Sequence, residues 1–371
     1  MKRVVSPLLA VLLGAALLSP AARANHQPCD GALHVEHHLP DGDNLKDVEM
    51  AGEEGWAVGT RHPDDTEERP LVVRFDIDSY EATVLEDIAT DARFLFVESV
   101  SVLSPNEIFV AGTSARRGTR GARTLVLRYD GSSWTQMVSP NRGNRTYLRG
   151  IEAIAPDDVW AVGFWFRPGG SSPSTYILHF DGDEWTEVPA PSPGKRAFLT
   201  DISAVASNDV WAVGGRSKIG LILHWDGSEW QRMRLPRRLR ATPADIQAVG
   251  ALPSGDAWIV GRYAGRGTRA LVLKRDGDSW AMHEAPNAHG AEWLFDVDAI
   301  EEDVWTTGYR FVPENAYPYV IHGEAGTWSR VATERPRAYG YYEGIAAGES
   351  GDAWAVGWTI YDQGALIAHS C

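Results

Sequence analysis

The phrase Asp209-Val-Trp-Ala-Val-Gly214 decides the fold of this chain. It is followed by the strand-like Gly220-Leu-Ile-Leu-His-Trp225, the pair Asp226-Gly227 and a further strand that opens at Trp230. The arrangement occurs seven times, and 47 to 53 residues separate successive copies of its central aromatic residue. That residue is, in order, Trp56, Phe109, Trp160, Trp211, Trp258, Trp305 and Trp354. Self-similarity at a period of about fifty residues indicates one supersecondary unit repeated along the chain.

Each unit is predicted to contain four antiparallel strands, lettered A to D, and no helix. The apolar residues recur with a period near two, and Gly, Asp, Asn, Ser or Pro stand at the joints. In the fourth unit the predicted strands cover residues 199–206, 210–214, 221–225 and 230–235. Asp226-Gly227 between C and D is typical of a tight hairpin. Seven such units predict an all-β fold, a seven-bladed β-propeller of four-stranded antiparallel blades, whose radial repetition protects the strand edges.

The chain ends predict how the ring closes. After Trp354 the last unit supplies only strands A, B and C, whereas the segment from Cys29 to Pro40 aligns with the strand D region of the fourth unit. The N-terminal segment is therefore predicted to supply the outer strand of the last blade. Cys29 and Cys371, the 2 cysteines of the chain, would then meet where the other blades have an unbroken hairpin. In an exported chain such a pair is predicted to form a structural disulfide.

Residues 1–24 have the pattern of a secretory signal peptide. A charged start is followed by an apolar run from Pro7 to Leu18, and Ala22-Arg23-Ala24 supplies the small residues of a cleavage site. That run is too short to span a membrane, and no later segment approaches the roughly 20 apolar residues that a span needs. We expect a secreted protein, extracellular or periplasmic after cleavage near Ala24, with residues 25–371 forming a single propeller domain.

The charge balance narrows the classes of partner. The chain contains 35 basic and 50 acidic residues, and its net charge is −15. Removing residues 1–24 takes away three basic residues, which leaves a net charge of about −18. This balance favours solubility and disfavours nucleic-acid binding. We expect a monomer that needs no cofactor and no metal.

Two sets of repeated residues are assigned to structure. A basic residue stands near the end of strand C in every unit: Arg74, Arg128, His179, His224, Lys274, His322 and His369. Because Arg and Lys take the same place as His, we interpret this set as partners for carboxylates of the nearby turns and not as a metal ring. The Trp residues of strands B and D are expected to pack between blades, where an aromatic side chain buries a large apolar area.

The B–C and D–A connections vary in length and should emerge on the same face of the ring, where a rigid scaffold usually carries its binding site. These connections contain about 25 basic and about 16 acidic residues. A cluster of basic residues falls in units two to five: Arg116, Arg117, Arg120, Arg123, Arg142, Arg145, Lys195, Arg196, Arg237, Arg238, Arg240, Arg262, Arg266 and Arg269. A cationic face favours an anionic partner. The alternative is that these residues serve solubility and pair with the acidic loop of unit one, which contains Asp64, Asp65, Glu67 and Glu68.

Two variable places just before strand A are expected to ring the mouth of the central channel on this face. The first is occupied by Asn44, Phe96, Tyr147, Phe198, Thr242, Trp293 and Tyr341. The second is occupied by Lys46, Glu98, Arg149, Thr200, Ala244, Phe295 and Glu343. Aromatic faces beside a few charges suit a carbohydrate or polymeric ligand, although the aromatic residues also fit a packing rule. The candidate ligand-binding residues are Lys46, Glu98, Tyr147, Arg149, Phe198, Trp293, Tyr341 and Glu343.

The tandem Val-Trp-Ala-Val-Gly and His-x-Asp-Gly-x-x-Trp phrases resemble those of secreted bacterial propellers of the kelch and galactose-oxidase-like superfamily. The resemblance covers essentially the whole mature chain and implies the fold more than an activity. Kelch units carry a Gly-Gly pair after strand B, which here only Gly214-Gly215 matches. Galactose oxidase needs a Cys-Tyr cross-link and copper ligands. Because both cysteines are assigned to ring closure, no copper-oxidase residues carry over.

Three functions follow as hypotheses. The first is an exported, non-catalytic binding protein that holds an anionic polymer or a carbohydrate on its cationic, aromatic face. The second is a lyase of acidic polysaccharides, in which Tyr147, Tyr341 or His289 would act as the base and Arg149 or Lys46 would neutralise the substrate carboxylate. The third is an extracellular protein–protein interaction scaffold.

Overall fold

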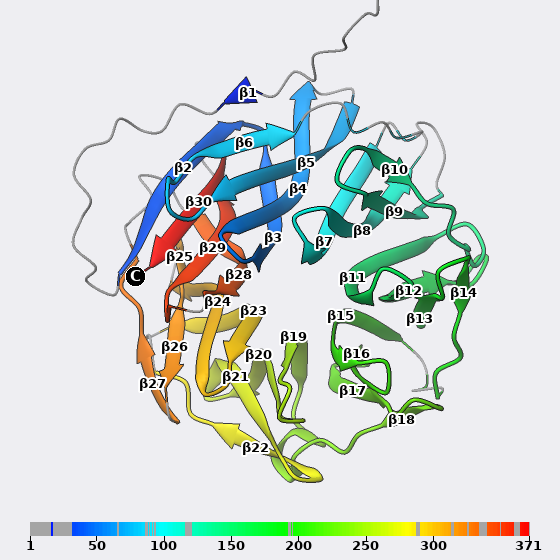
Figure 1. The fold of residues 1–371 in the computed structure, drawn as a ribbon. Coiled ribbons are helices and arrows are strands. Elements are labelled where there is room, and N and C mark those ends of the chain that lie inside the picture. Colours follow the sequence, from blue (N-terminus) through cyan, green and yellow to red (C-terminus); the bar gives the residue numbers. More distant parts are fainter. Residues whose placement is uncertain are drawn as a thin grey trace, which may run out of the picture.

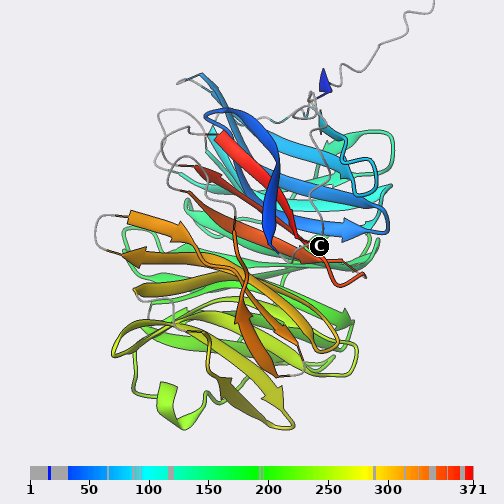
Figure 2. The same cartoon turned by 90° about the vertical axis from the view of Figure 1, so that its left-hand side faces the viewer.

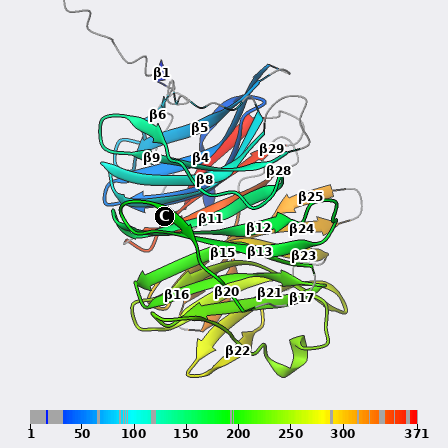
Figure 3. The ribbon, with the colours of Figure 1, turned by 90° about the vertical axis from the view of Figure 1, so that its right-hand side faces the viewer.

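The computed structural model describes residues 16–17 and 32–370, except for 65–66, 86–87, 89, 91, 93, 116–120, 192–193, 195, 287–289, 313–314, 325, 334–339, 349 and 360–363. Seven antiparallel sheets of four strands stand around a central axis, so the predicted β-propeller is confirmed (Figure 1). Figures 2 and 3 show the ring edge-on from opposite sides. In the described part of the chain the helical structure is one 3₁₀ turn, η1 (Arg237–Leu239).

The strands follow the predicted order A to D in each blade. Blade one contains β3 (Asn44–Ala51), β4 (Glu54–Asp64), β5 (Glu67–Asp76) and β6 (Ala82–Leu85). Blade two contains β7 (Phe94–Ser104), β8 (Glu107–Ala115), β9 (Arg123–Tyr129) and β10 (Trp134–Gln136). Blade three contains β11 (Thr146–Ala155), β12 (Asp158–Phe166), β13 (Pro173–Phe180) and β14 (Trp185–Glu187). Blade four contains β15 (Ala197–Ala206), β16 (Asp209–Arg216), β17 (Ile219–Trp225) and β18 (Trp230–Arg232). Blade five contains β19 (Ala244–Ala251), β20 (Ala257–Gly265), β21 (Gly267–Asp276) and β22 (Ser279–His283). Blade six contains β23 (Ala291–Ile300), β24 (Asp303–Val312), β26 (Ile321–Glu324) and β27 (Thr327–Arg330). Two short strands extend the sheets: β1 (Ala16–Leu17) pairs with β6, and β25 (Asn315–Pro318) pairs with β24.

The seventh blade joins the two ends of the chain. Its strands are β28 (Gly340–Ala347), β29 (Ala353–Thr359), β30 (Gly364–Ser370) and, on the outside, β2 (Leu33–Asp41). Strand β2 pairs antiparallel with β30, and Leu33 lies opposite Ser370. The N-terminal segment therefore supplies the outer strand of the last blade, as the sequence predicts. Cys29 and Cys371 lie outside the described residues, so their disulfide stays a prediction.

The hydrophobic core is divided into layers between neighbouring blades. In the layer between blades three and four, Trp160 of β12 meets Trp230 of β18 edge to face, with ring centroids 5.5 Å apart. Trp211 of β16 meets Trp280 of β22 in the same way one blade further on. The predicted packing of the strand B and strand D tryptophans between blades is therefore confirmed, and these aromatic contacts tie each sheet to the next.

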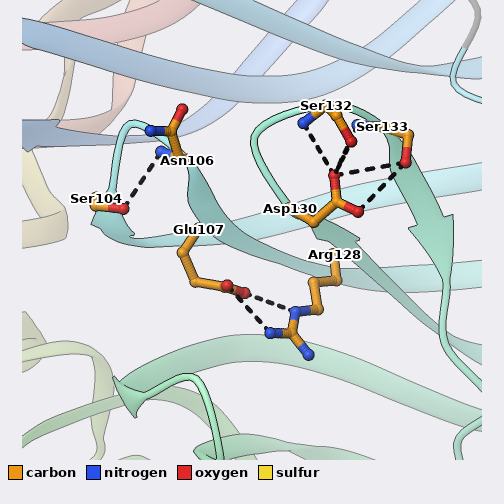
Figure 4. A network of polar contacts seen from close by, with 7 residues as sticks. All are labelled: Ser104, Asn106, Glu107, Arg128, Asp130, Ser132 and Ser133. Atoms are coloured by element: carbon orange, nitrogen blue, oxygen red, sulfur yellow. Dashed lines mark hydrogen bonds and ion pairs between the residues drawn. The ribbon is translucent and has the colours of Figure 1, made fainter.

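The repeated basic residue of strand C binds the carboxylate that opens strand B. In blade two the Arg128 guanidinium donates to both carboxylate oxygens of Glu107, at 2.6 and 3.1 Å (Figure 4). In blade four His224 Nε2 lies 2.8 Å from Asp209 Oδ1, and its ring stacks on Trp211 at 4.1 Å. The interpretation of this set as partners for carboxylates near the turns is confirmed.

The C–D hairpins use the Asp-Gly chemistry that the sequence predicts. Asp130 Oδ1 accepts the backbone N–H groups of Ser132 and Ser133 at 2.9 and 2.8 Å and the Ser132 hydroxyl at 2.7 Å (Figure 4). These hydrogen bonds, the Ser132 hydroxyl first, lower the pKa of Asp130 to about 2. Gly131 follows with φ 85°, a conformation that favours glycine.

Among the described residues, no helix has the length and apolar character needed to cross a membrane.

Candidate functional site

Each innermost strand carries a one-residue β-bulge at the same place in the repeat. In blade four, Leu199 pairs with Gly214 and Asp201 pairs with Val213, which leaves Thr200 without a partner residue. The same register shift occurs in β3, β7, β11, β19, β23 and β28. A bulge changes the direction of a side chain and bends its strand. Here it places one side chain from each blade at the mouth of the channel.

The bulge also explains the glycine that ends the repeated phrase Asp-Val-Trp-Ala-Val-Gly. A Cβ on Gly214 would lie 2.2 Å from the carbonyl oxygen of Phe198, in the strand beside it. The equivalent glycines of the other six blades meet the same obstacle, with clearances of 1.9 to 2.1 Å. Real Cβ atoms do not approach a carbonyl oxygen so closely, so only glycine fits there.

The seven bulged residues line one cavity of about 500 Å³ at the channel mouth. They are Lys46, Glu98, Arg149, Thr200, Gln247, Phe295 and Glu343. Phe164 and Phe166 at the end of β12 and Pro173 at the start of β13 line the same cavity. The second of the two predicted mouth places therefore lines the cavity in every blade except blade five, whereas at the first place only Phe198 and Trp293 line it.

The prediction that Thr242 and Ala244 occupy the mouth in blade five is wrong. Asp245 pairs with Arg262, Ile246 pairs with Gly261, and the bulge falls at Gln247. The sequence phrase Pro243-Ala244-Asp245-Ile246 imitates the usual one three residues too early. Ala244 is buried instead, because it packs in the core layer between blades four and five.

Four charged residues of the mouth form two ion pairs between neighbouring blades. Lys46 Nζ donates to Glu343 Oε1 at 2.7 Å, which joins blades one and seven. Arg149 Nη1 lies 2.8 Å from Glu98 Oε2, which joins blades three and two. The two cations expected to attract an anionic ligand are thus each balanced by a carboxylate at the same rim.

Aromatic side chains form two walls on opposite sides of the cavity. Phe164, Phe166 and Phe198 line it from blades three and four, and the Phe164 and Phe198 rings lie 6.3 Å apart. Trp293 and Phe295 line it from blade six, with ring centroids 5.3 Å apart. The mouth therefore offers apolar walls in addition to its two ion pairs.

Not every predicted site residue reaches the cavity. Lys46, Glu98, Arg149, Phe198, Trp293 and Glu343 line it. Tyr147 stacks on Phe164 at 4.9 Å, and Tyr341 packs on Phe295 at 5.8 Å, so both tyrosines support wall residues from behind. Burial raises the pKa of Tyr341 above its ordinary value, which disfavours a phenolate base. His289 lies outside the described residues.

Several arginines of the variable loops are held by acids of nearby loops. Arg142 pairs with Glu187 at 2.5 Å and Arg262 with Asp245 at 2.7 Å. In the acidic loop of blade one, Glu67 pairs with Arg69 of the same blade. Arg142, Arg262 and Arg269 of the basic cluster thus pair with acids of blades three, five and six, not with those of blade one. Arg116, Arg117, Arg120 and Lys195 lie outside the described residues.

Six carboxyl groups lie along the channel below the bulged residues. Asp47, Asp201 and Asp296 follow the bulge in blades one, four and six and line the cavity, while Glu49, Glu152 and Asp298 lie two residues further along blades one, three and six. Five of the six accept a backbone N–H from the next blade; examples are Asp47 from Val100 at 2.9 Å and Asp201 from Val249 at 2.8 Å. These acids clamp neighbouring inner strands together.

Removal from water raises the pKa of all six carboxyls. The pKa of Asp47 rises to about 6 and that of Asp201 to about 7, and burial is the largest cause in each case. Repulsion between the acids adds to it, because Glu152 is repelled by Glu49, Asp201, Asp298 and Asp47. Acids on blades one, three, four and six therefore influence one another across the axis.

Sequence reasoning missed this acidic channel, although the signal was present. Asp47, Asp201 and Asp296 stand at one repeated place, next to the predicted mouth residues but not among them. Strand alternation alone does not show that they face the axis, because the bulge just before them changes the phase of the strand. In the described residues, no cluster of His, Cys, Asp and Glu has an arrangement suited to a metal ion.

Comparison with known proteins gives the fold and no family. No protein-family model matches the chain, and no curated protein matches it. Among solved structures, YCF48 bound to a D1 peptide is 15% identical, with a TM-score of 0.58 over 95% of this chain and 99% of that one. A protein of unknown function from Dyadobacter fermentans is 14% identical, with a TM-score of 0.55 over 91% and 96%. The β-propeller domain of the trilobed protease from Pyrococcus furiosus, which has an open velcro topology, is 13% identical, with a TM-score of 0.52 over 88% and 95%. At these identities the likeness shows that the chain has the β-propeller fold.

Proposed function

We propose that the protein is an exported, non-catalytic binding module that holds a segment of another polypeptide at the mouth of its central channel. The observation that carries the proposal is the cavity of about 500 Å³, which combines two aromatic walls with charges of both signs. A concave site in which aromatic walls stand beside convergent polar groups is typical of ligand binding. A peptide offers apolar side chains for the walls and charged or amide groups for Lys46, Glu98, Arg149 and Glu343.

Two contacts favour a peptide over a carbohydrate. The guanidinium of Arg262 lies 3.5 Å from the centre of the Trp293 ring, and that of Arg145 lies 4.2 Å from the centre of the Phe166 ring. These arginines occupy ring faces on which a sugar would stack. The ion pairs Lys46–Glu343 and Arg149–Glu98 also disfavour a strongly anionic polymer, because each cation already has a partner.

Two further observations support the proposal. A propeller that matches nearly the whole chain, YCF48, has been solved with a bound peptide. The signal-peptide pattern of residues 1–24 supports action outside the cytoplasm. The repeat phrases support kinship with kelch-type propellers, whose fold serves many unrelated functions.

The test measures retention of the purified protein on arrays of 15-residue peptides and on acidic and neutral polysaccharides, together with ultraviolet absorbance of unsaturated sugar products. The matched variants are Phe198→Ala and Phe96→Ala. Both phenylalanines occupy the same place in the repeat, but Phe198 lines the cavity, whereas Phe96 is 52% exposed and lies outside its lining. We expect peptide retention that Phe198→Ala reduces about tenfold and Phe96→Ala leaves nearly unchanged.

Other results would point to the other functions. Retention on a polysaccharide with the same dependence on Phe198 would make the protein a carbohydrate-binding module. Absorbance growth would make it a lyase. Peptide retention that both variants leave unchanged would place the binding surface elsewhere on the molecule and contradict the proposal.

A further inference from the structure

We infer that the channel below the mouth receives a cationic side chain, a lysine ammonium or an arginine guanidinium, from the bound polypeptide. This inference rests on the proposed function and adds the chemistry of the group that enters the channel. It depends on three features: the acids on the channel wall, the aromatic walls above them and the unpartnered carboxyl of Glu152.

The acids surround the axis without an ion pair to any cation that the structure describes. Asp47, Asp201 and Asp296 line the cavity from blades one, four and six. Lys46 and Arg149, the two cations of the rim, are already held by Glu343 and Glu98. Among the described residues, no ion pair engages any of the six channel acids. A ligand cation would therefore supply a positive charge that no described residue supplies.

Glu152 distinguishes this channel from a purely structural arrangement. The other five acids each accept at least one backbone N–H, and so their presence is explained by the contact between blades. Glu152 makes no hydrogen bond or ion pair with any residue that the structure describes. It is partly buried and is repelled first by Glu49 and then by Asp201. A carboxyl that neighbouring acids repel, and that has no hydrogen-bond or ion-pair partner among the described residues, is typical of a binding group.

The aromatic walls favour an organic cation. Phe164 and Phe198 stand on one side of the entrance and Phe295 on the other. A long side chain with an ammonium or guanidinium end would place its methylene groups between these rings and its charge among the acids. Because the cavity acids come from three different blades, several N–H donors of one group could reach different carboxylates.

The first experiment compares peptides that differ only in the charge of one side chain. The probes are fluorescein-labelled, C-amidated peptides of sequence Gly-Phe-Gly-X-Gly-Phe-Gly, in which X is lysine, N-acetyl-lysine, arginine or glutamate. Binding to the full-length mature protein is measured by fluorescence anisotropy. We expect the lysine and arginine peptides to bind about tenfold more tightly than the N-acetyl-lysine peptide, which has nearly the same shape without the charge.

The second experiment uses Glu152→Gln, with the exposed turn residue change Glu229→Gln as its control. We expect Glu152→Gln to weaken binding of the lysine peptide about tenfold, to leave the N-acetyl-lysine peptide unchanged and to raise the melting temperature by about 2–4 °C, since one repelled carboxyl is removed. Glu229→Gln should change neither the binding of the two peptides nor the melting temperature. A gain in stability excludes misfolding as the cause of weaker binding.

The outcomes separate the inference from the proposed function. If the lysine and N-acetyl-lysine peptides bind equally and Phe198→Ala weakens both, the peptide site stands and the cationic subsite is refuted. If no peptide binds, both ideas fail. If Ca²⁺ alone binds, Glu152→Gln abolishes that binding and the lysine peptide has no affinity, the channel is a metal site and the inference is overturned.

Discussion

Gly214 shows how a single residue links the repeat to the site. Its missing side chain lets the bulged inner strand bring the Phe198 carbonyl to within 2.2 Å of the position that a Cβ would occupy. We predict that Gly214→Ala lowers the free energy of unfolding by about 3 kcal/mol, because the backbone of one strand must move. Urea denaturation measures the change.

Gly169→Ala is the control for Gly214→Ala. Gly169 has φ 71°, and no atom lies within 4 Å of the position that its Cβ would occupy, so only the left-handed conformation opposes a side chain. Its expected cost is about 1 kcal/mol. Equal costs for the two variants would refute the explanation of the signature glycine by the bulge.

At the scale of elements, side chains of one inner strand hold the backbone of the next. Ser101 Oγ in β7 accepts the N–H of Ala153 in β11 at 3.0 Å, and Ser101 is buried. We predict that Ser101→Ala destabilises the protein by about 1–3 kcal/mol, because it leaves a buried backbone N–H without an acceptor. Hydrogen exchange should show faster exchange in β11.

The matched control is Ser228→Ala. Ser228 donates to Asp226 at 2.7 Å in an exposed C–D turn. Water can partly replace that hydrogen bond, so we expect a smaller loss of stability than for Ser101→Ala and no change in the exchange of β11. Unchanged exchange in Ser101→Ala would show that the serine is not a clamp between blades.

At the scale of the whole molecule, the channel acids predict a stability that rises as the pH falls from about 8 toward 5. Their pKa values are raised, to about 6 for Asp47 and about 7 for Asp201, so the folded protein binds protons there more tightly than the unfolded chain does. The loss of folding stability caused by burying these carboxylates is complete above their folded pKa values and disappears as the acids protonate. Buried His37 and half-buried His283, whose pKa values are lowered by desolvation, oppose this trend below about pH 6.5.

Below about pH 4 the trend should reverse. Hydrogen bonds lower the pKa of Asp130 and of Asp226 to about 2, with the adjacent serine hydroxyls as the largest cause, and that stabilisation is lost as these turn carboxylates protonate. Melting temperatures between pH 3 and 8 should therefore pass through a maximum between about pH 4 and 5. A steady fall in melting temperature from pH 8 downward would contradict the repulsion in the channel.

Closure of the ring gives a second prediction for the whole molecule. The pairing of Leu33 with Ser370 brings the first and last propeller strands together. We predict a disulfide between Cys29 and Cys371 in the exported protein, which non-reducing peptide mapping would detect. For a loop of this length the chain-entropy model gives about 4–5 kcal/mol of stabilisation, which reduction should remove. Two free thiols in the exported protein would refute the bridge.

The sequence by itself determined the seven blades, their strand order, the hairpins between strands C and D and the placement of the N-terminal segment in the last blade. These features depend on local patterns, namely apolar residues with a period of two, Asp-Gly turns and a repeat of about fifty residues. The patterns recur along the chain from unit to unit. It also placed six of the eight candidate ligand-binding residues on the cavity wall, because the repeat puts equivalent residues at equivalent positions around the axis.

Only the tertiary structure decided what those residues do together. Lys46 and Glu343 are 297 positions apart and meet because the ring closes, so no local pattern predicts that the rim cations are paired. The place of Gln247 depends on a bulge that the phrase before Ile246 conceals. The acids of the channel act on one another across the axis, which is a property of the closed ring and not of any one blade.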